Sequence, residues 1–195
     1  MHTPDYEKDR ALVREAARSD PEAMRQIVER HQDHVYRLAY RLVSDAEAAR
    51  DIAQDTFLKA FENLGGMNNG RALSQWLSQI TVNLVRDRWR TRKKTVCLDE
   101  GDPDLPRSRL NPLQDVELQE MGEHIQAALM ELPRAYREVF LLKYVEEMSY
   151  EEISDLLGVS VPAAKVQAHR ACKMLRRLLP EYENSEEMRD GPETR

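Results

Sequence analysis

The feature that most constrains the fold is a stretch without hydrophobic periodicity between two segments that have helical periodicity. This stretch, residues 95–112, carries little apolar surface, so it can bury too little to fold. Its acidic, glycine and proline residues include Asp99, Glu100, Gly101, Asp102, Pro103, Asp104 and Pro106. We expect a flexible acidic linker there, joining two small domains at residues 9–94 and 113–179, with an acidic tail at 180–195.

The composition favours helices in both domains. Glycine is scarce, at 7 residues, and aromatic residues make up 6% of the chain, whereas Ala, Leu, Glu and Arg are abundant. We therefore expect an all-α fold. Cys97 and Cys172 are far apart and belong to no metal-binding pattern, so we expect reduced thiols. No apolar run has the length of a signal peptide or a membrane span, which predicts a soluble cytoplasmic protein without membrane insertion.

Helix signals divide the first segment. A short helix over residues 9–18 precedes a long one, which begins with Asp20 as its cap and runs to about Val43. The next predicted helix follows residues 44–45 and ends at the glycines 65–66, and a third runs from residue 73 into a basic block. The third helix follows a polar loop at 67–72.

Two histidines of the long helix, His31 and His34, lie about one turn apart and could in principle chelate a metal ion. Two ligands make an incomplete site, however. We interpret both as residues of an ordinary helix surface and predict no metal site.

In the second segment, two predicted helices are joined by a tight turn with matched caps. Ser149 and Glu152 have the spacing of a capping box, Gly158 suits a left-handed turn, and Ser160 can cap the next helix. This pattern predicts a helix-turn-helix, whose second helix enters the major groove of DNA with its first turns. The alternative is a plain helical hairpin with a solvated basic face.

The distribution of charge supports DNA binding, although the net charge is −6. Phosphate neutralisation requires only local positive charge. The two basic blocks comprise Arg86, Arg88, Arg90, Arg92, Lys93 and Lys94, and then Lys165, Arg170, Lys173, Arg176 and Arg177. Acidic residues lie elsewhere, notably in the linker and the tail.

The second segment resembles region four of the extracytoplasmic-function (ECF) sigma factors, which are bacterial transcription initiation factors. The resemblance is carried by residues 132–142, by the helix after Ser149, and by Lys165 and His169-Arg170-Ala171. It implies binding of the minus-thirty-five promoter element and the polymerase flap. The residues implied to contact this element are Ser160, Pro162, Ala163, Lys165, Val166, His169, Arg170 and Lys173. Residues 163–164 and 166–168 depart from common family residues, so the base preference cannot be carried over.

Residues 45–61 resemble region two point two of the same family, whose polar face docks on the clamp coiled coil of the largest polymerase subunit. The implied polymerase-binding residues are Asp51, Gln54, Asp55 and Leu58. At helical spacing they share one side, opposite the predicted core stripe, and an acidic face with an exposed leucine suits a helical partner. Taken alone, this helix could equally present an ordinary solvated face.

Residues 76–90 resemble regions two point three and two point four. Basic residues interleaved with an aromatic residue can track phosphates and stack on exposed bases, as promoter melting requires. The implied minus-ten residues are Asn68, Asn69, Arg71, Asn83, Arg86, Arg88, Trp89 and Arg90. Trp76 is expected in the core, whereas Trp89 could either stack on a base or pack.

These observations together predict an alternative sigma factor that binds core RNA polymerase and promoter DNA and is controlled by an anti-sigma factor. No glycine-rich phosphate loop, nucleophile elbow or catalytic carboxylate pair is present, so we expect no enzymatic activity and no cofactor. Two other classes fit parts of the sequence. A stand-alone helix-turn-helix regulator would bind duplex DNA without polymerase. An adaptor that sequesters a sigma or anti-sigma factor would not need the basic block at residues 86–94.

Overall fold

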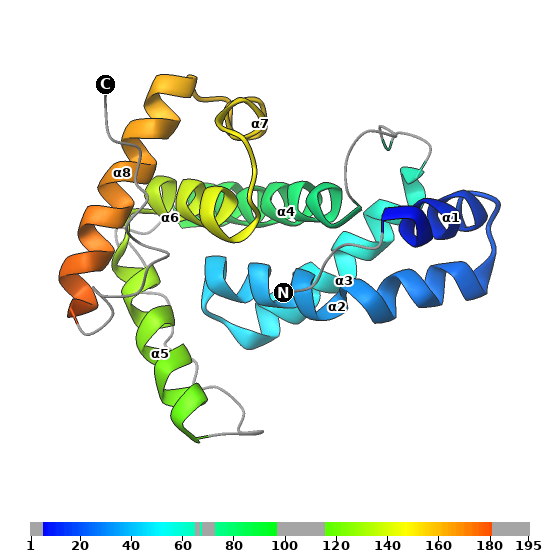
Figure 1. The fold of residues 1–195 in the computed structure, drawn as a ribbon, viewed down its shortest axis with the longest axis horizontal. Helices are drawn as coiled ribbons and strands as arrows, with labels where there is room; N and C mark the ends of the chain where they lie inside the picture. Colours follow the sequence, from blue (N-terminus) through cyan, green and yellow to red (C-terminus); the bar gives the residue numbers. More distant parts are fainter. Residues whose placement is uncertain (1–5, 65–66, 68–72, 97–115, 181–195) are drawn as a thin grey trace. The chain divides into compact units, whose positions relative to one another are not determined.

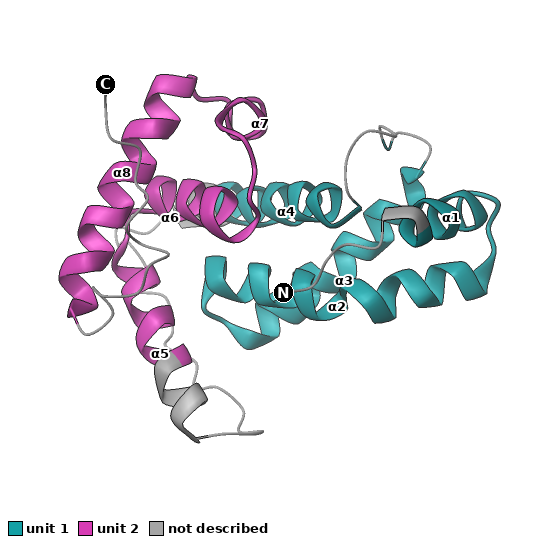
Figure 2. Cartoon of the chain, in the orientation of Figure 1, with its two compact units in different colours: residues 1–108 teal, residues 109–195 magenta. Residues whose placement is uncertain are grey.

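The computed structural model describes residues 6–64, 67, 73–96 and 116–180 (Figure 1). The regular elements in these residues are all helical, which confirms the predicted all-α fold. The chain divides into two compact units, residues 1–108 and 109–195, shown in different colours in Figure 2. Each unit has its own buried core and is described separately below.

The first unit is a helical bundle centred on the helix over Pro21–Val43. Its helices are α1 (Tyr6–Ala16), α2 (Pro21–Val43), α3 (Ala46–Glu62) and α4 (Leu73–Val96). Helix α2 contacts the other three, and α3 also packs against α4. Side chains that are almost fully buried in this unit include Ile27, Val35, Leu38, Leu42, Leu73, Leu77 and Val82. The hydrophobic stripes predicted from the sequence therefore face one another.

The ends of α2 and α3 follow from local hydrogen bonding. Asp20 Oδ1 accepts from the Glu22 N–H (2.9 Å), and Asp45 Oδ1 accepts from the Ala48 N–H (2.9 Å), as expected of capping residues. Helix α3 ends at Glu62, before the predicted stop at residues 65–66. At the C-cap, Asn63 Nδ2 donates to the Lys59 carbonyl of the last turn (2.8 Å), which provides a side-chain donor where helix carbonyls lack partners in the next turn.

The two histidines of α2 are half-buried against neighbouring helices, so the predicted ordinary helix surface describes them only in part. The His31 side chain is only 12% exposed, and its Nε2 lies 3.5 Å from Asp9 Oδ2 of α1. Arg30 Nη1 donates to the other oxygen of Asp9 (2.8 Å). His34 Nε2 lies 2.9 Å from Ser78 Oγ of α4. The histidines face neighbouring helices because α2 is covered on several sides. In the described residues, no group of three or more His, Cys, Asp or Glu could hold a metal ion.

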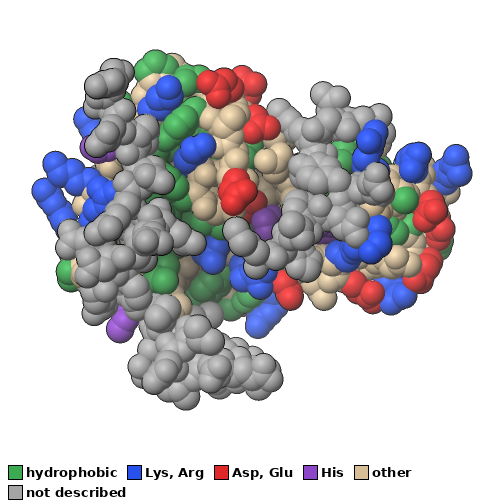
Figure 3. All heavy atoms as spheres, viewed as in Figure 1, with side chains coloured by type: hydrophobic (Ala, Val, Ile, Leu, Met, Phe, Trp, Pro, Cys, Tyr) green, Lys and Arg blue, Asp and Glu red, His purple; other side chains and the backbone are tan. Residues whose placement is uncertain are grey.

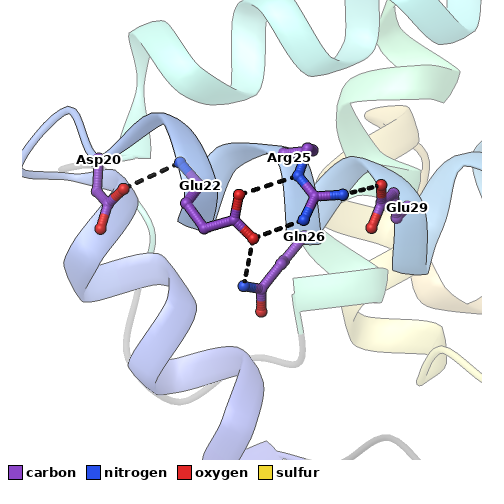
Figure 4. Close-up of polar contacts among 5 residues, drawn as sticks. All are labelled: Asp20, Glu22, Arg25, Gln26 and Glu29. Atoms are coloured by element: carbon purple, nitrogen blue, oxygen red, sulfur yellow. Dashed lines mark hydrogen bonds and ion pairs between the residues drawn. The ribbon is translucent and has the colours of Figure 1, made fainter.

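The first turns of α2 carry an exposed network of charged side chains (Figure 4). Arg25 donates to both oxygens of Glu22 (2.6 and 3.0 Å) and to Glu29 (2.5 Å), and Gln26 also donates to Glu22 (3.0 Å). The hydrogen bonds from Arg25 lower the pKa of Glu22 to about 2. These pairs at helical spacing support the start of α2, although exposed pairs of this kind contribute little each.

The second unit contains five helical elements. They are α5 (Val116–Glu131), α6 (Arg134–Phe140), the π-helical segment η2 (Leu141–Val145), α7 (Tyr150–Leu157) and α8 (Val161–Leu178). Helix α8 contacts α5, α6 and α7. In α5, Ile125 is 38% exposed. Ile125 lies at helical spacing with the buried Ala128, Leu129 and Leu132, about one turn before the first two of them along α5.

A buried arginine joins α5 to α6. Arg137 Nε donates to the Leu129 carbonyl (2.8 Å), and Nη2 donates to those of Met130 (3.0 Å) and Leu132 (3.2 Å). Carbonyls at a helix end have few partners within the helix, and Arg137 donates to three of them at the end of α5. The Leu129 carbonyl also accepts from the Leu132 N–H (3.2 Å). Burial lowers the pKa of Arg137 to about 10, with a smaller contribution from Arg134. The guanidinium is still protonated at neutral pH.

Candidate nucleic-acid interface

Helices α7 and α8 form the helix-turn-helix that the sequence predicts. The Ser149 N–H donates to Glu152 Oε2 (2.9 Å), and the Glu152 N–H donates to Ser149 Oγ (3.1 Å), which completes the capping box. Gly158 ends α7 in the left-handed region, at φ 68°, where a side chain would be strained. Ser160 Oγ accepts from the Ala163 N–H (3.3 Å) and caps α8.

Helix α8 has one buried face and one exposed face. Ala164, Ala168, Ala171 and Leu175 are buried against the rest of the unit. Of the residues implied to contact the minus-thirty-five element, seven are exposed: Ser160, Pro162, Lys165, Val166, His169, Arg170 and Lys173. Ala163 is half-buried. The structure thus brings these side chains to the surface of one helix.

Two tyrosines contact the cations of α8. Lys165 Nζ lies 5.7 Å from the centre of the Tyr150 ring, and Lys143 Nζ lies 5.0 Å from the same ring. Arg170 Nη1 donates to the Tyr136 hydroxyl (3.0 Å). No sequence pattern indicated these tyrosines, because Tyr136 and Arg170 are 34 positions apart. Their contacts restrict where the two cationic groups can lie.

Tyr144 of η2 lies beside Tyr150 of α7 and Cys172 of α8. Burial and the hydrogen bond with Cys172 raise the pKa of Tyr144 well above its usual range. The Tyr144 hydroxyl is therefore protonated at neutral pH and carries no negative charge near the cations of α8.

The four residues implied to bind polymerase lie together on α3. Asp51, Gln54, Asp55 and Leu58 are all exposed, and Leu58 is 54% exposed. The opposite side of the helix carries the buried residues Ile52, Thr56 and Phe57. An exposed leucine among acidic and amide side chains is a feature of surfaces that bind a helical partner.

The α4 residues implied to bind the minus-ten element differ in exposure. Asn83, Arg88 and Arg90 are exposed, whereas Arg86 and Trp89 are half-buried. Arg88 Nη1 lies 3.8 Å from Asp51 Oδ2 of α3, and Arg90 forms an ion pair with Asp87. The implied polymerase and minus-ten surfaces therefore adjoin at Arg88.

Other residues singled out from the sequence can be placed only in part. Trp76 is half-buried and packs against the core of the first unit, as expected. Asn68, Asn69 and Arg71 lie outside the described residues, as do the side chains of 92–94.

On the face shown in Figure 3, Lys and Arg side chains lie among Asp and Glu side chains, so positive charge is local. Within the described residues, no helix is long and apolar enough to cross a membrane.

The fold and these surfaces define a helix-turn-helix protein of the DNA-binding class, with a second helical unit that presents an acidic face. Comparison with known families identifies both units. Residues 27–95 match Sigma-70 region 2, and residues 123–175 match Sigma-70, region 4.

Full-length relatives agree with the family matches. The chain is 32% identical over 182 residues to the ECF RNA polymerase sigma factor SigW of Bacillus subtilis, covering 86% of this chain and 94% of the relative. It is 36% identical over 159 residues to the ECF RNA polymerase sigma factor SigE of Mycolicibacterium smegmatis, covering 80% and 62%. The chain therefore belongs to the ECF RNA polymerase sigma factors, a family of non-catalytic initiation factors. It is an alternative sigma factor that directs transcription initiation.

A solved structure has the same fold. The sigma factor RpoE from Bartonella quintana, in complex with the anti-sigma factor NepR, superposes with a TM-score of 0.68 and 26% identity. The match covers 80% of this chain and 96% of that chain. The predicted family, fold and function are thus confirmed, and a stand-alone regulator is not favoured.

Proposed function

We propose that this sigma factor divides promoter recognition among three surfaces. The exposed face of α3 binds the clamp coiled coil of core RNA polymerase, the basic end of α4 captures the minus-ten element, and α8 reads the minus-thirty-five element. The observation that carries the proposal is the exposure of these side chains in a chain of this family. Residues that served only folding would be expected on the buried faces of the same helices.

The chemistry of α4 suits capture of a single strand. The exposed guanidinium groups of Arg88 and Arg90 can neutralise phosphates, while the half-buried Trp89 can offer part of its ring to an unstacked base. Stacking of a base on an aromatic side chain contributes about 1–3 kcal/mol. Such capture offsets the cost of unpairing, so the factor can promote duplex opening without performing a reaction itself.

We also propose that an anti-sigma factor controls this chain by covering its polymerase-binding surfaces. Support comes from the similar fold of RpoE, which was solved in complex with the anti-sigma factor NepR. In this scheme residues 9–94 and 113–179 fold as independent domains, and the residues between them let one partner reach both. The protein would act in the cytoplasm, where it meets core polymerase.

Run-off transcription with purified core polymerase tests the proposed function. We expect the full chain to direct specific transcripts from its own promoters without any added activator. Binding of promoter duplex by the chain alone, with no transcript in the presence of core polymerase, would instead support a stand-alone regulator. Polymerase binding without promoter opening would support an adaptor.

A further inference from the structure

The outer face of the first turns of α8 carries two exposed apolar side chains. Val166 is 48% exposed, and Pro162, about one turn before it, is also exposed. The buried face of α8 runs through Ala164 and Ala168, so Val166 contributes little to the core. A β-branched residue also has lower helix propensity than alanine. Neither packing nor helix propensity explains this side chain.

The residues around Val166 indicate what covers it. Lys165, His169 and Arg170 are exposed beside it, and Lys165 and Arg170 are restrained by Tyr150 and Tyr136. This surface has two restrained cations on either side of an apolar patch. It is therefore complementary to a polyanion that exposes an apolar group between its negative charges. Duplex DNA has this arrangement, since phosphates border a groove in which bases present their edges.

An aliphatic side chain can recognise one base in that groove. Val166 has neither a donor nor an acceptor, and thymine presents a methyl group in the major groove where the other bases present only polar atoms or a ring edge. Because a recognition helix meets the bases with its first turns, Val166 is well placed for this contact. We propose that Val166 is a specificity-determining residue that recognises a thymine of the upstream promoter element through its C5 methyl group. This inference rests on the proposed role of α8.

Removal of single methyl groups from the DNA tests this assignment. The holoenzyme, formed from the full chain and core polymerase, first selects its preferred upstream element from randomised duplexes. Each thymine of that element is then replaced by deoxyuridine, which removes only the methyl group, and the Kd is measured. We expect one replacement to weaken binding about fourfold, the effect of about one buried methyl group. Val166→Ala should bind the thymine duplex about fourfold more weakly and be insensitive to that replacement.

Val145→Ala is the matched control, because Val145 is 38% exposed on η2 and is not among the residues implied to contact DNA. It should keep the wild-type sensitivity to deoxyuridine at every position. If the selected element contains no thymine, or if Val166→Ala is as sensitive as the wild type at every thymine, the assignment is overturned while the role of α8 stands. If the holoenzyme selects no upstream element, the proposed role of α8 fails, and the assignment fails with it.

Discussion

The guanidinium of Arg170 donates a hydrogen bond from Nη1 to the Tyr136 hydroxyl, across 3.0 Å and between α8 and α6. The tyrosine accepts through its oxygen, so its own proton is still available to a second acceptor, such as a phosphate. An arginine oriented in this way loses less conformational entropy when it binds DNA than one that moves freely. Tyr136 is thus a positioning residue for Arg170.

Tyr136→Phe should weaken promoter binding by about 0.5–1 kcal/mol, because Arg170 loses a hydrogen bond that orients it. In the Arg170→Ala background, the same change should have little further effect, since the pair acts together. The Kd of the holoenzyme measured over a salt series checks this, and Arg170→Ala should lower the salt slope by about one. Equal losses from Tyr136→Phe in both backgrounds would contradict the coupling.

The proposed polymerase-binding face of α3 can be tested with Asp55→Arg combined with Leu58→Ala. Both side chains are exposed, so helicity should not change, but the affinity for core polymerase should fall by about 2 kcal/mol, typical of removing an interface hot spot. A titration of labelled protein with core polymerase measures this. Glu123→Arg, a charge reversal at an exposed position of α5, is the control. Unaltered affinity of the double variant would remove the α3 assignment.

The basic end of α4 should affect opening more than upstream binding. Replacing Arg86, Arg88 and Arg90 with alanine removes cations available to the displaced strand, so permanganate reactivity of nontemplate thymines should fall. Loss of the Arg88–Asp51 ion pair should cost little stability, because both side chains are largely exposed. Lys165→Ala should mainly weaken upstream duplex binding. Normal reactivity of the triple variant would mean that these arginines form only a solvated helix end.

Arg137→Met should destabilise the second unit by about 2–4 kcal/mol, because it removes the hydrogen bonds that Arg137 donates to three carbonyls at the end of α5. Arg137→Lys should restore only part of this stability, since an ammonium group cannot reach three carbonyls with a planar fork. Urea unfolding followed by circular dichroism measures both. Arg177→Met, at an exposed position of α8, should have a much smaller effect. Similar losses for the two methionine variants would argue against the capping role.

Acid unfolding should depend in part on Glu22, whose pKa is lowered to about 2 by its hydrogen bonds with Arg25. A carboxylate with a lowered pKa in the folded state stabilises the fold above its unfolded pKa of about 4.5, and this contribution is lost as the pH falls toward 2. Glu22→Gln should therefore flatten the fall in Tm below pH 4.5, and salt should reduce the difference because the network is exposed. Glu123→Gln serves as the control. Identical acid profiles for Glu22→Gln and the wild type would show that the network does not affect stability.

Much of the local structure of this protein could be predicted from its sequence, because it depends on residues that are close together in the chain. Asp20, Asp45, Ser149 and Ser160 each begin a helix where their side chains predict it, because a cap needs only a backbone N–H within three residues. Hydrophobic spacing likewise placed the exposed face of α3 opposite its buried stripe. The helix-turn-helix could be predicted because its caps and its left-handed Gly158 are encoded within a few neighbouring residues.

Contacts between distant segments were decided only by the tertiary structure. Periodicity shows that one side of a helix is covered, but it does not identify the covering element. It therefore did not identify the contact of His31 with Asp9 or that of His34 with Ser78. The positions of Arg137 under α5 and of Arg170 against Tyr136 depend in the same way on how helices meet. The sequence alone determined which helices form and which faces are apolar, whereas helix packing determined which polar side chains are held in place by contacts with other helices.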